Sequence, residues 1–395
     1  MKVILFELRK IFEWKRILAL IVLNILLINS PFVDFMAIQE QDLTLFREMV
    51  EIYGLTVNLE DIQDFAKTLV ISIEDFDAYL EARPGLADLG ITTFEEFQQH
   101  LYNWEFLLAM NHSPFFVQRM VNIPEDFDAR LFIIHHWHYA QHQGNDIGYL
   151  SFIVGQGSFS RMGTRAQEVY TRPDQYLFPG IITRFYRGNM SGMAFLAIAN
   201  VMILLMPLSI KERKNQMFSF QYTSKLGRKL FLSKIAAAMI TSTIVVFAKI
   251  AILFTFLIPI FQLRVFLPMN VNSAFGALMW YDLTFLQYIM LTSALVYLIA
   301  LLLSIFTALL SRLSPNLLTV LAVIIPFILF MNTSFYLTIM TTDSIFPWTI
   351  GWLDDWVTRY NPSFFIPSLH ALNIVVVVSL LAILWRREKK LDITI

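Results

Sequence analysis

The stretch LTFLQYIMLTSALVYLIALLLSIFTALLS, Leu283–Ser311, is followed by Arg312 and then by LSPNLLTVLAVIIPFILFMNTSFYLTIMTT, Leu313–Thr342. Neither run contains a charged residue, and each is longer than the roughly 20 residues that cross the ~30 Å hydrocarbon core of a bilayer. As an ideal helix each run is about 44 Å long at ~1.5 Å per residue, so it must tilt or extend beyond the membrane. The chain is therefore predicted to be an integral membrane protein.

The overall composition agrees with this prediction. Of the 395 residues, 56% are hydrophobic and only 15% are charged. The chain has no cysteine, which excludes disulfides, iron–sulfur clusters, thiolate zinc sites and cysteine nucleophiles.

Six apolar segments of spanning length occur along the chain. They are Ile17–Val33, Met190–Ile210, Ile235–Leu263, Leu283–Ser311, Leu313–Thr342 and Ile366–Trp385. We interpret the first as an uncleaved span rather than a signal peptide, because residues 1–16 before it are too mixed in charge. The turn Arg312–Asn316 contains a Pro and an Asn that suit a tight reversal. The predicted fold is an all-α polytopic membrane protein with six spans, and an even number places both termini on one side.

The charges are divided between the two sides of this topology. One side carries 17 Lys or Arg and 5 Asp or Glu, and it consists of residues 1–16, the second-to-third connection, the turn at Arg312 and the tail 386–395. The other side carries 12 Lys or Arg and 26 Asp or Glu. Lysine and arginine accumulate in cytoplasmic loops. We therefore expect a multi-pass protein of the cell membrane with both termini in the cytoplasm.

The large polar region, residues 34–189, is then an extracellular domain with 22 acidic and 10 basic residues. Its first part is predicted to be mainly helical, because three N-cap residues are each followed three positions later by an acid. These pairs are Asn58 with Asp61, Ser72 with Asp75, and Thr93 with Glu96. Glycines from Gly144 to Gly163 around Tyr149–Val154 favour loops with a short strand.

The sequence lacks the common catalytic signatures. There is no Walker A loop, no HExxH and no GxSxG. His135, His138 and His142 would share one face of a helix, at a spacing compatible with Zn²⁺ or Cu²⁺. The alternative is a helix with surface imidazoles, and the sequence leaves both open.

Lys249 lies in the middle of the third predicted span. A charged side chain there costs about 2.5–3.5 kcal/mol on insertion scales, so it usually faces a bundle interior or a wet cavity. A role in a transport pathway or at a helix interface is favoured, with snorkelling of the side chain toward the membrane surface as the alternative.

The basic connection SIKERKNQMFSFQYTSKLGRKLFLSK, Ser209–Lys234, joins the second and third spans. Ser209 and Glu212 have the spacing of a capping box. Phe218 is one of several aromatic residues among the polar ones, and Gly227 precedes Arg228 at a predicted break. This pattern favours a short amphipathic helix against the inner leaflet, and the alternative is an ordinary basic loop.

Three features together resemble the permease subunits of type 2 ABC transporters. The first is the amphipathic basic segment MKVILFELRKIFEWKR, residues 1–16, and the second is six spans with both termini inside. The third is the pattern E-R…S-K-L-G-R…S-K, formed by Glu212, Arg213, Ser224, Lys225, Leu226, Gly227, Arg228, Ser233 and Lys234. The resemblance covers the membrane part, which is over half of the chain.

The resemblance implies an interfacial elbow helix at residues 1–16 and a coupling helix within residues 209–234. The coupling helix would dock on a separate cytoplasmic ABC ATPase that binds ATP and Mg, and two permeases would pair in the lipid bilayer. Residues 190–395 would hold the second to sixth spans. The residues assigned to coupling are then Ser209, Glu212, Arg213, Phe218, Gly227 and Arg228. Lys249 is assigned to the transport pathway. Neither an enzymatic activity nor a nucleic-acid partner is expected for this chain.

The large insertion between the first and second spans departs from the minimal family pattern. It is similar to the lipid-exporting and the sodium- or peptide-exporting branches, so the expected substrate is amphipathic, lipid-like or a peptide. Two other classes stay open. One is a membrane-bound acyltransferase or metal-dependent hydrolase that uses the histidine cluster or His370, and the other is a non-transporting membrane sensor.

Overall fold

The computed structural model describes residues 2–33, 40–81, 92–97, 168–169, 171–214, 227–260, 263–273, 275, 282–324 and 362–390. Within these ranges the protein is mostly helical. Three segments are long and apolar enough to cross a membrane, namely Gly192–Ile210, Leu230–Thr255 and Phe285–Leu313. The described part therefore fits the predicted all-α membrane protein.

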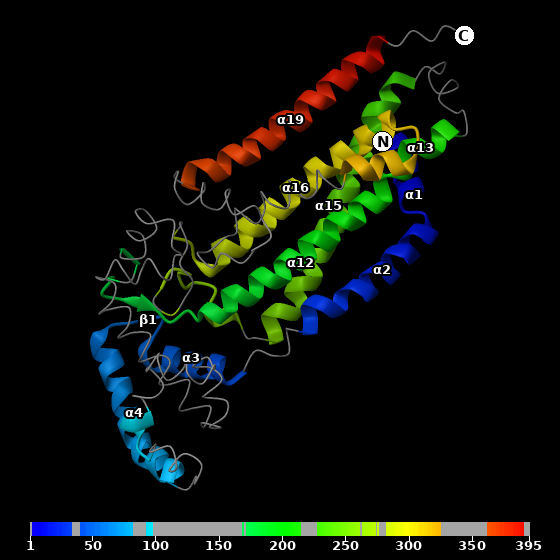
Figure 1. Cartoon of the computed structure of the whole chain (residues 1–395). Coiled ribbons are helices and arrows are strands. Elements are labelled where there is room, and N and C mark those ends of the chain that lie inside the picture. Colours follow the sequence, from blue (N-terminus) through cyan, green and yellow to red (C-terminus); the bar gives the residue numbers. More distant parts are fainter. Residues whose placement is uncertain are drawn as a thin grey trace.

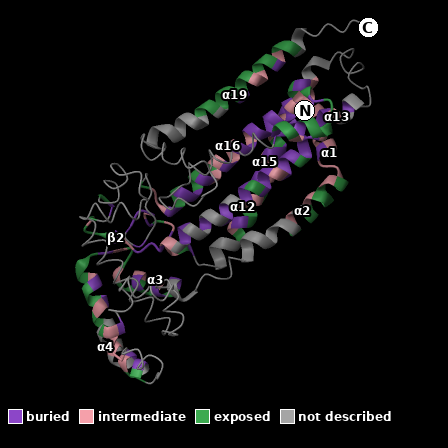
Figure 2. Ribbon diagram, viewed as in Figure 1, coloured by how far each residue is buried: buried purple, intermediate pink, exposed green. Residues whose placement is uncertain are grey.

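Three helices form the centre of a bundle: α12 (Gly180–Leu205), α15 (Gly227–Ile260) and α16 (Phe285–Leu313) pack against one another. Helix α2 (Trp14–Val33) packs along α12, and α19 (Pro362–Lys390) packs along α16, as Figure 1 shows. The described side chains of α12 and α16 are mostly buried, whereas about a third of the apolar part of α15 is buried and most of the described side chains of α19 are exposed (Figure 2). Exposed apolar side chains on the peripheral helices suit a lipid environment, because lipid tails are as apolar as the core of a protein.

Two short helices lie at one end of this bundle, together with the C-terminal end of α19 (Figure 1). They are α1 (Lys2–Ile11) and α13 (Pro207–Lys214). The prediction of one elbow helix over residues 1–16 needs correction, because α1 stops at Ile11 and α2 already starts at Trp14. The break lets the buried side chain of Ile11 dock α1 on the bundle.

Two central helices begin earlier than their predicted spans. Helix α12 starts at Gly180 rather than Met190, and α15 starts at Gly227 rather than Ile235. A helix can continue into water because its backbone hydrogen bonds are internal. The apolar composition of a segment predicts which part of the helix suits lipid, but it does not predict the residue at which the helix begins or ends.

The predicted break after the fourth span is present at residues 314–316, although α16 extends through Arg312, which the prediction placed in the turn. Helix α16 begins with a capping box between Thr284 and Gln287, and it ends at Leu313. The chain is helical again over residues 317–324, where the Oδ1 atom of Asn316 accepts a hydrogen bond from the backbone N–H of Thr319 at 2.8 Å.

The opposite end of the bundle is joined to a polar region with α3 (Glu40–Tyr53), α4 (Leu59–Glu81) and two short strands. Strand β1 (Thr56–Val57) pairs antiparallel with β2 (Gln175–Tyr176), with Thr56 opposite Tyr176. The turn between α3 and β1 uses Gly54, whose φ of 89° favours glycine.

Two of the three predicted helix caps in this region are confirmed. The Asn58–Asp61 pair bonds reciprocally at 2.9 and 3.1 Å, and the Thr93–Glu96 pair does so at 3.1 and 3.3 Å. The third prediction is wrong, because α4 runs through Ser72 without a break. The strand expected around residues 149–154 lies outside the described residues.

Candidate functional site

Four charged side chains meet where α1, α13 and α15 come together, and we call them the junction cluster: Glu7, Lys10, Glu212 and Lys234. The Nζ atom of Lys10 lies 3.3 Å from Oε1 of Glu7 and 3.0 Å from Oε1 of Glu212. Lys234 pairs with the other carboxylate oxygen of Glu212. One carboxylate therefore links α13 to two other helices.

The pattern of α1 explains how Glu7 enters this cluster. Glu7 and Ile11 lie one helical turn apart, and both are buried on the face that docks on the bundle. Lys10, one turn from Glu7, reaches across to α13. Burial alone would lower the pKa of Lys10, but the hydrogen bond and the charge of Glu212, aided by Glu7, outweigh it and raise that pKa above its usual value.

The junction cluster pairs two carboxylates with two ammonium groups, and three of the four side chains are buried, whereas Lys10 keeps 37% of its side chain exposed. The side chains of Glu212 and Lys234 keep only 6% and 7% of their surface exposed. Breaking a buried pair by removing one partner typically destabilises a protein by about 3–5 kcal/mol, because it leaves an uncompensated charge. The cluster therefore holds α1, α13 and α15 in one fixed arrangement.

The residues that the sequence assigned to coupling are only partly brought together. The capping box of Ser209 and Glu212 is not formed, because α13 begins earlier, at Pro207. The backbone N–H of Ser209 instead donates to Oγ of Ser311 at 3.0 Å, and that hydroxyl donates to the carbonyl of Met206 at 2.8 Å. Ser209 thus helps to fix α13 to α16.

The structure places the other coupling residues as follows. Arg213 lies in α13, Gly227 is the first residue of α15, and Arg228 follows it in the first turn. Phe218 lies outside the described residues. Glu212 was assigned to coupling with a separate ATPase, but the structure buries its carboxylate against lysines of its own chain.

A second polar cluster lies between α2, α12 and α15, and we call it the amide cluster: Asn24, Asn200 and Lys249. The two asparagines exchange hydrogen bonds, with donor–acceptor distances of 3.1 and 3.4 Å. The Nζ atom of Lys249 donates to Oδ1 of Asn24 at 2.6 Å. The position of Lys249 at a helix interface agrees with the sequence interpretation, and a role in a pathway stays a prediction.

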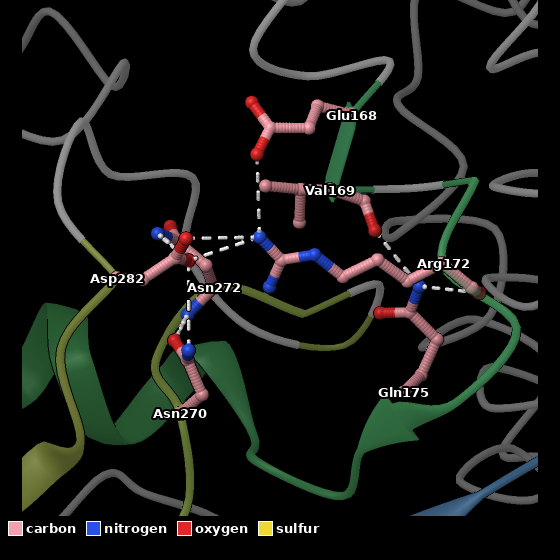
Figure 3. A network of polar contacts seen from close by, with 7 residues as sticks. All are labelled: Glu168, Val169, Arg172, Gln175, Asn270, Asn272 and Asp282. Atoms are coloured by element: carbon pink, nitrogen blue, oxygen red, sulfur yellow. Dashed lines mark hydrogen bonds and ion pairs between the residues drawn. The ribbon is translucent and has the colours of Figure 1, made fainter.

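A third network lies at the end of the bundle that carries β1 and β2 (Figure 3). Nη2 of Arg172 lies 3.1 and 3.0 Å from the two carboxylate oxygens of Asp282, which precedes α16. The Nδ2 atom of Asn272 also donates to Asp282, at 3.2 Å. Gln175 is buried, and its Nε2 atom donates to the carbonyls of Val169 and Arg172 at 2.9 and 3.1 Å. These contacts tie the segment before β2 to the start of α16.

The histidines proposed as metal ligands, His135, His138 and His142, lie outside the described residues. In the part of the chain that the structure describes, no three His, Cys, Asp or Glu side chains are placed to hold a metal ion.

Comparisons of the chain with protein-family models, with curated proteins and with solved structures found no match.

Proposed function

We propose that this chain is the permease subunit of an ATP-driven type 2 ABC exporter in the cell membrane. In this proposal six helices span the bilayer, both termini and residues 209–234 are cytoplasmic, and residues 34–189 are extracellular. Two permeases pair to form the pathway. ATP and Mg bind to a separate ATPase, which the permease contacts from the cytoplasm.

The junction cluster is the observation that carries this proposal. A transporter without its own ATPase must pass a motion from its cytoplasmic surface into its spanning helices. Glu212 on α13 is joined to Lys234 on α15 and to Lys10 on α1. A push on α13 would therefore move α15 and the amphipathic N-terminal helix together.

The exposed apolar surface of the peripheral helices also supports a function in the bilayer. Ile17, Leu18 and Ile25 of α2 are exposed, as are Leu372 and Val375 of α19. Such surfaces are unfavourable in water and neutral in lipid.

The test begins with a search for an ABC ATPase gene beside that of this chain, followed by co-expression and purification of the two proteins. We expect the two proteins to purify as a complex whose ATP turnover requires both, and Glu212→Gln should reduce turnover while expression stays measurable. The matched control is Lys67→Met, which removes an exposed charge from α4. A membrane enzyme or a sensor would act without any ATPase. Enzymatic turnover or a ligand response by the chain alone, with no ATPase bound, would therefore overturn the proposal.

A further inference from the structure

We propose that Lys249 is the binding site for the anionic head of an amphipathic molecule, a carboxylate or a phosphate, that enters between α2 and α15 from the lipid. This inference rests on the proposed function and specifies the substrate class of the pathway. It is carried by the contacts, charge and surroundings of the amide cluster.

The amide cluster lies at the middle of the apolar part of the bundle. Asn24 is ten residues beyond Trp14, the first residue of α2, which places it about 15 Å along that helix at ~1.5 Å per residue. This is half of the ~30 Å hydrocarbon thickness. Arg16 donates to the carbonyl of Leu204 at 3.4 Å, and Asn24 bonds Asn200, so α2 and α12 run antiparallel.

The hydrogen bonds within the cluster are arranged for the lysine. Oδ1 of Asn24 accepts from both Asn200 and Lys249, while its Nδ2 atom donates to the carbonyl of Leu20 at 2.6 Å. Asn200 is buried, with 3% of its surface exposed. Its hydrogen bonds therefore fix the amide group of Asn24, whose oxygen faces the ammonium group of Lys249.

The charge of Lys249 is not balanced by this arrangement. An ammonium group has three N–H donors, and an amide oxygen offers only a partial negative charge. Among the described residues, Lys249 makes the bond to Asn24 and no ion pair. Two donors and a full positive charge are thus available in an apolar region, where an anion provides the strongest partner.

The surroundings select an anion that carries an apolar tail. One helical turn from Asn24 and from Lys249, on the same faces, Ile21 and Ile252 expose 50% and 43% of their surfaces. Lys249 itself is only partly buried. A headgroup at Lys249 would therefore place its hydrocarbon chain against exposed isoleucines, whereas a small hydrated anion would have to leave water to reach the site.

The experiment uses the full chain in phosphatidylcholine vesicles, without an ATPase. Palmitic acid with a diazirine in its chain is photo-crosslinked, its methyl ester serves as the uncharged probe, and mass spectrometry locates the adducts. We expect the acid, but not the ester, to label peptides of α2 and α15. Lys249→Met should raise the half-saturating acid concentration about tenfold, which corresponds to about 1.4 kcal/mol.

Controls separate the charge from the fold. Lys249→Arg should retain labelling, and Lys67→Met, which alters a distant exposed charge, should leave it unchanged. Dodecyl phosphate should compete with the probe, whereas inorganic phosphate should not. Equal labelling by acid and ester, or labelling that Lys249→Met leaves intact, would overturn the proposal.

Two further outcomes would also contradict it. Competition by inorganic phosphate would show a site for a free anion. Efficient disulfide formation between copies of an Ile252→Cys variant, with no labelling by the acid, would show that a second copy covers this face. Binding is measured without ATP, so its failure leaves the permease proposal standing, and a missing ATPase partner leaves the binding result standing.

Discussion

Glu212 on α13 and Lys234 on α15 form an ion pair in which each side chain is more than nine-tenths buried. The two residues are 22 positions apart, and both belong to the basic connection Ser209–Lys234 that was predicted to reach a partner. The pair therefore connects α13, at the end of the bundle, with the central helix α15.

Replacement of Glu212 by Gln should destabilise the bundle by about 3–5 kcal/mol, because Lys234 would be left buried without its carboxylate partner. The double variant Glu212→Gln with Lys234→Met should recover most of that loss, since it removes both charges. Thermal unfolding in detergent measures both effects. Equal stability of the single variant and the wild type would show that the pair is weak or solvated.

The docking of α1 should depend on alkaline pH. The pKa of Lys10 is raised above 10.5 in the folded chain, so its contribution is complete below the ordinary pKa and is lost as the pH rises through the higher folded value. The reaction of an Ile11→Cys variant with a maleimide reports release of this buried position. Lys10→Arg in the same background should resist release, because a guanidinium does not titrate there. The same pH response in both would exclude Lys10 as the cause.

In the network around Arg172 and Asp282, the burial of a side chain should affect stability more than its formal charge does. Asp282→Asn should cost about 1 kcal/mol or less, because Arg172 and Asp282 keep 27% and 42% of their side chains exposed. Gln175→Leu should cost more, about 1–3 kcal/mol, because it removes a buried donor from the carbonyls of Val169 and Arg172, and the Val169 carbonyl keeps only the long bond from the backbone N–H of Arg172 at 3.4 Å. Hydrogen exchange at residues 175–178 compares the two variants, and a larger effect of Asp282→Asn would reverse this ranking.

The topology can be tested without background, because the chain has no native cysteine. We expect a cysteine that replaces the exposed Asn58 to react with an impermeant maleimide on intact cells. One that replaces Lys390 should react only after permeabilisation. Labelling of position 390 in intact cells would contradict two cytoplasmic termini.

The histidine prediction concerns metal retention. If His135, His138 and His142 bind a metal, the dialysed protein should keep about one Zn²⁺ or Cu²⁺ per chain. The double replacement His138→Ala with His142→Ala should abolish it, as measured by elemental analysis. A metal-free wild type with full activity would favour surface imidazoles.

The sequence by itself determined the features that depend on neighbouring residues. The apolar run before Arg312 predicted a spanning helix, and Pro315 with Asn316 predicted the break that follows it. The caps at Asn58 and Thr93 were predicted for the same reason, since a cap involves residues three positions apart. Helix ends were less predictable, as Ser72 and Gly180 show, because a helix continues wherever tertiary packing supports it.

Only the tertiary structure decided which polar groups meet. Asn24 and Lys249 are separated by 225 positions, and Lys10 and Glu212 by 202. No local spacing relates such residues, because their contact depends on how α1, α2, α13 and α15 pack. Glu7 was a signal that the sequence analysis did not use, since a carboxylate on the apolar face of an amphipathic helix requires a buried partner. The sequence located Lys249 as an unusual charge, and helix packing supplied its partner Asn24.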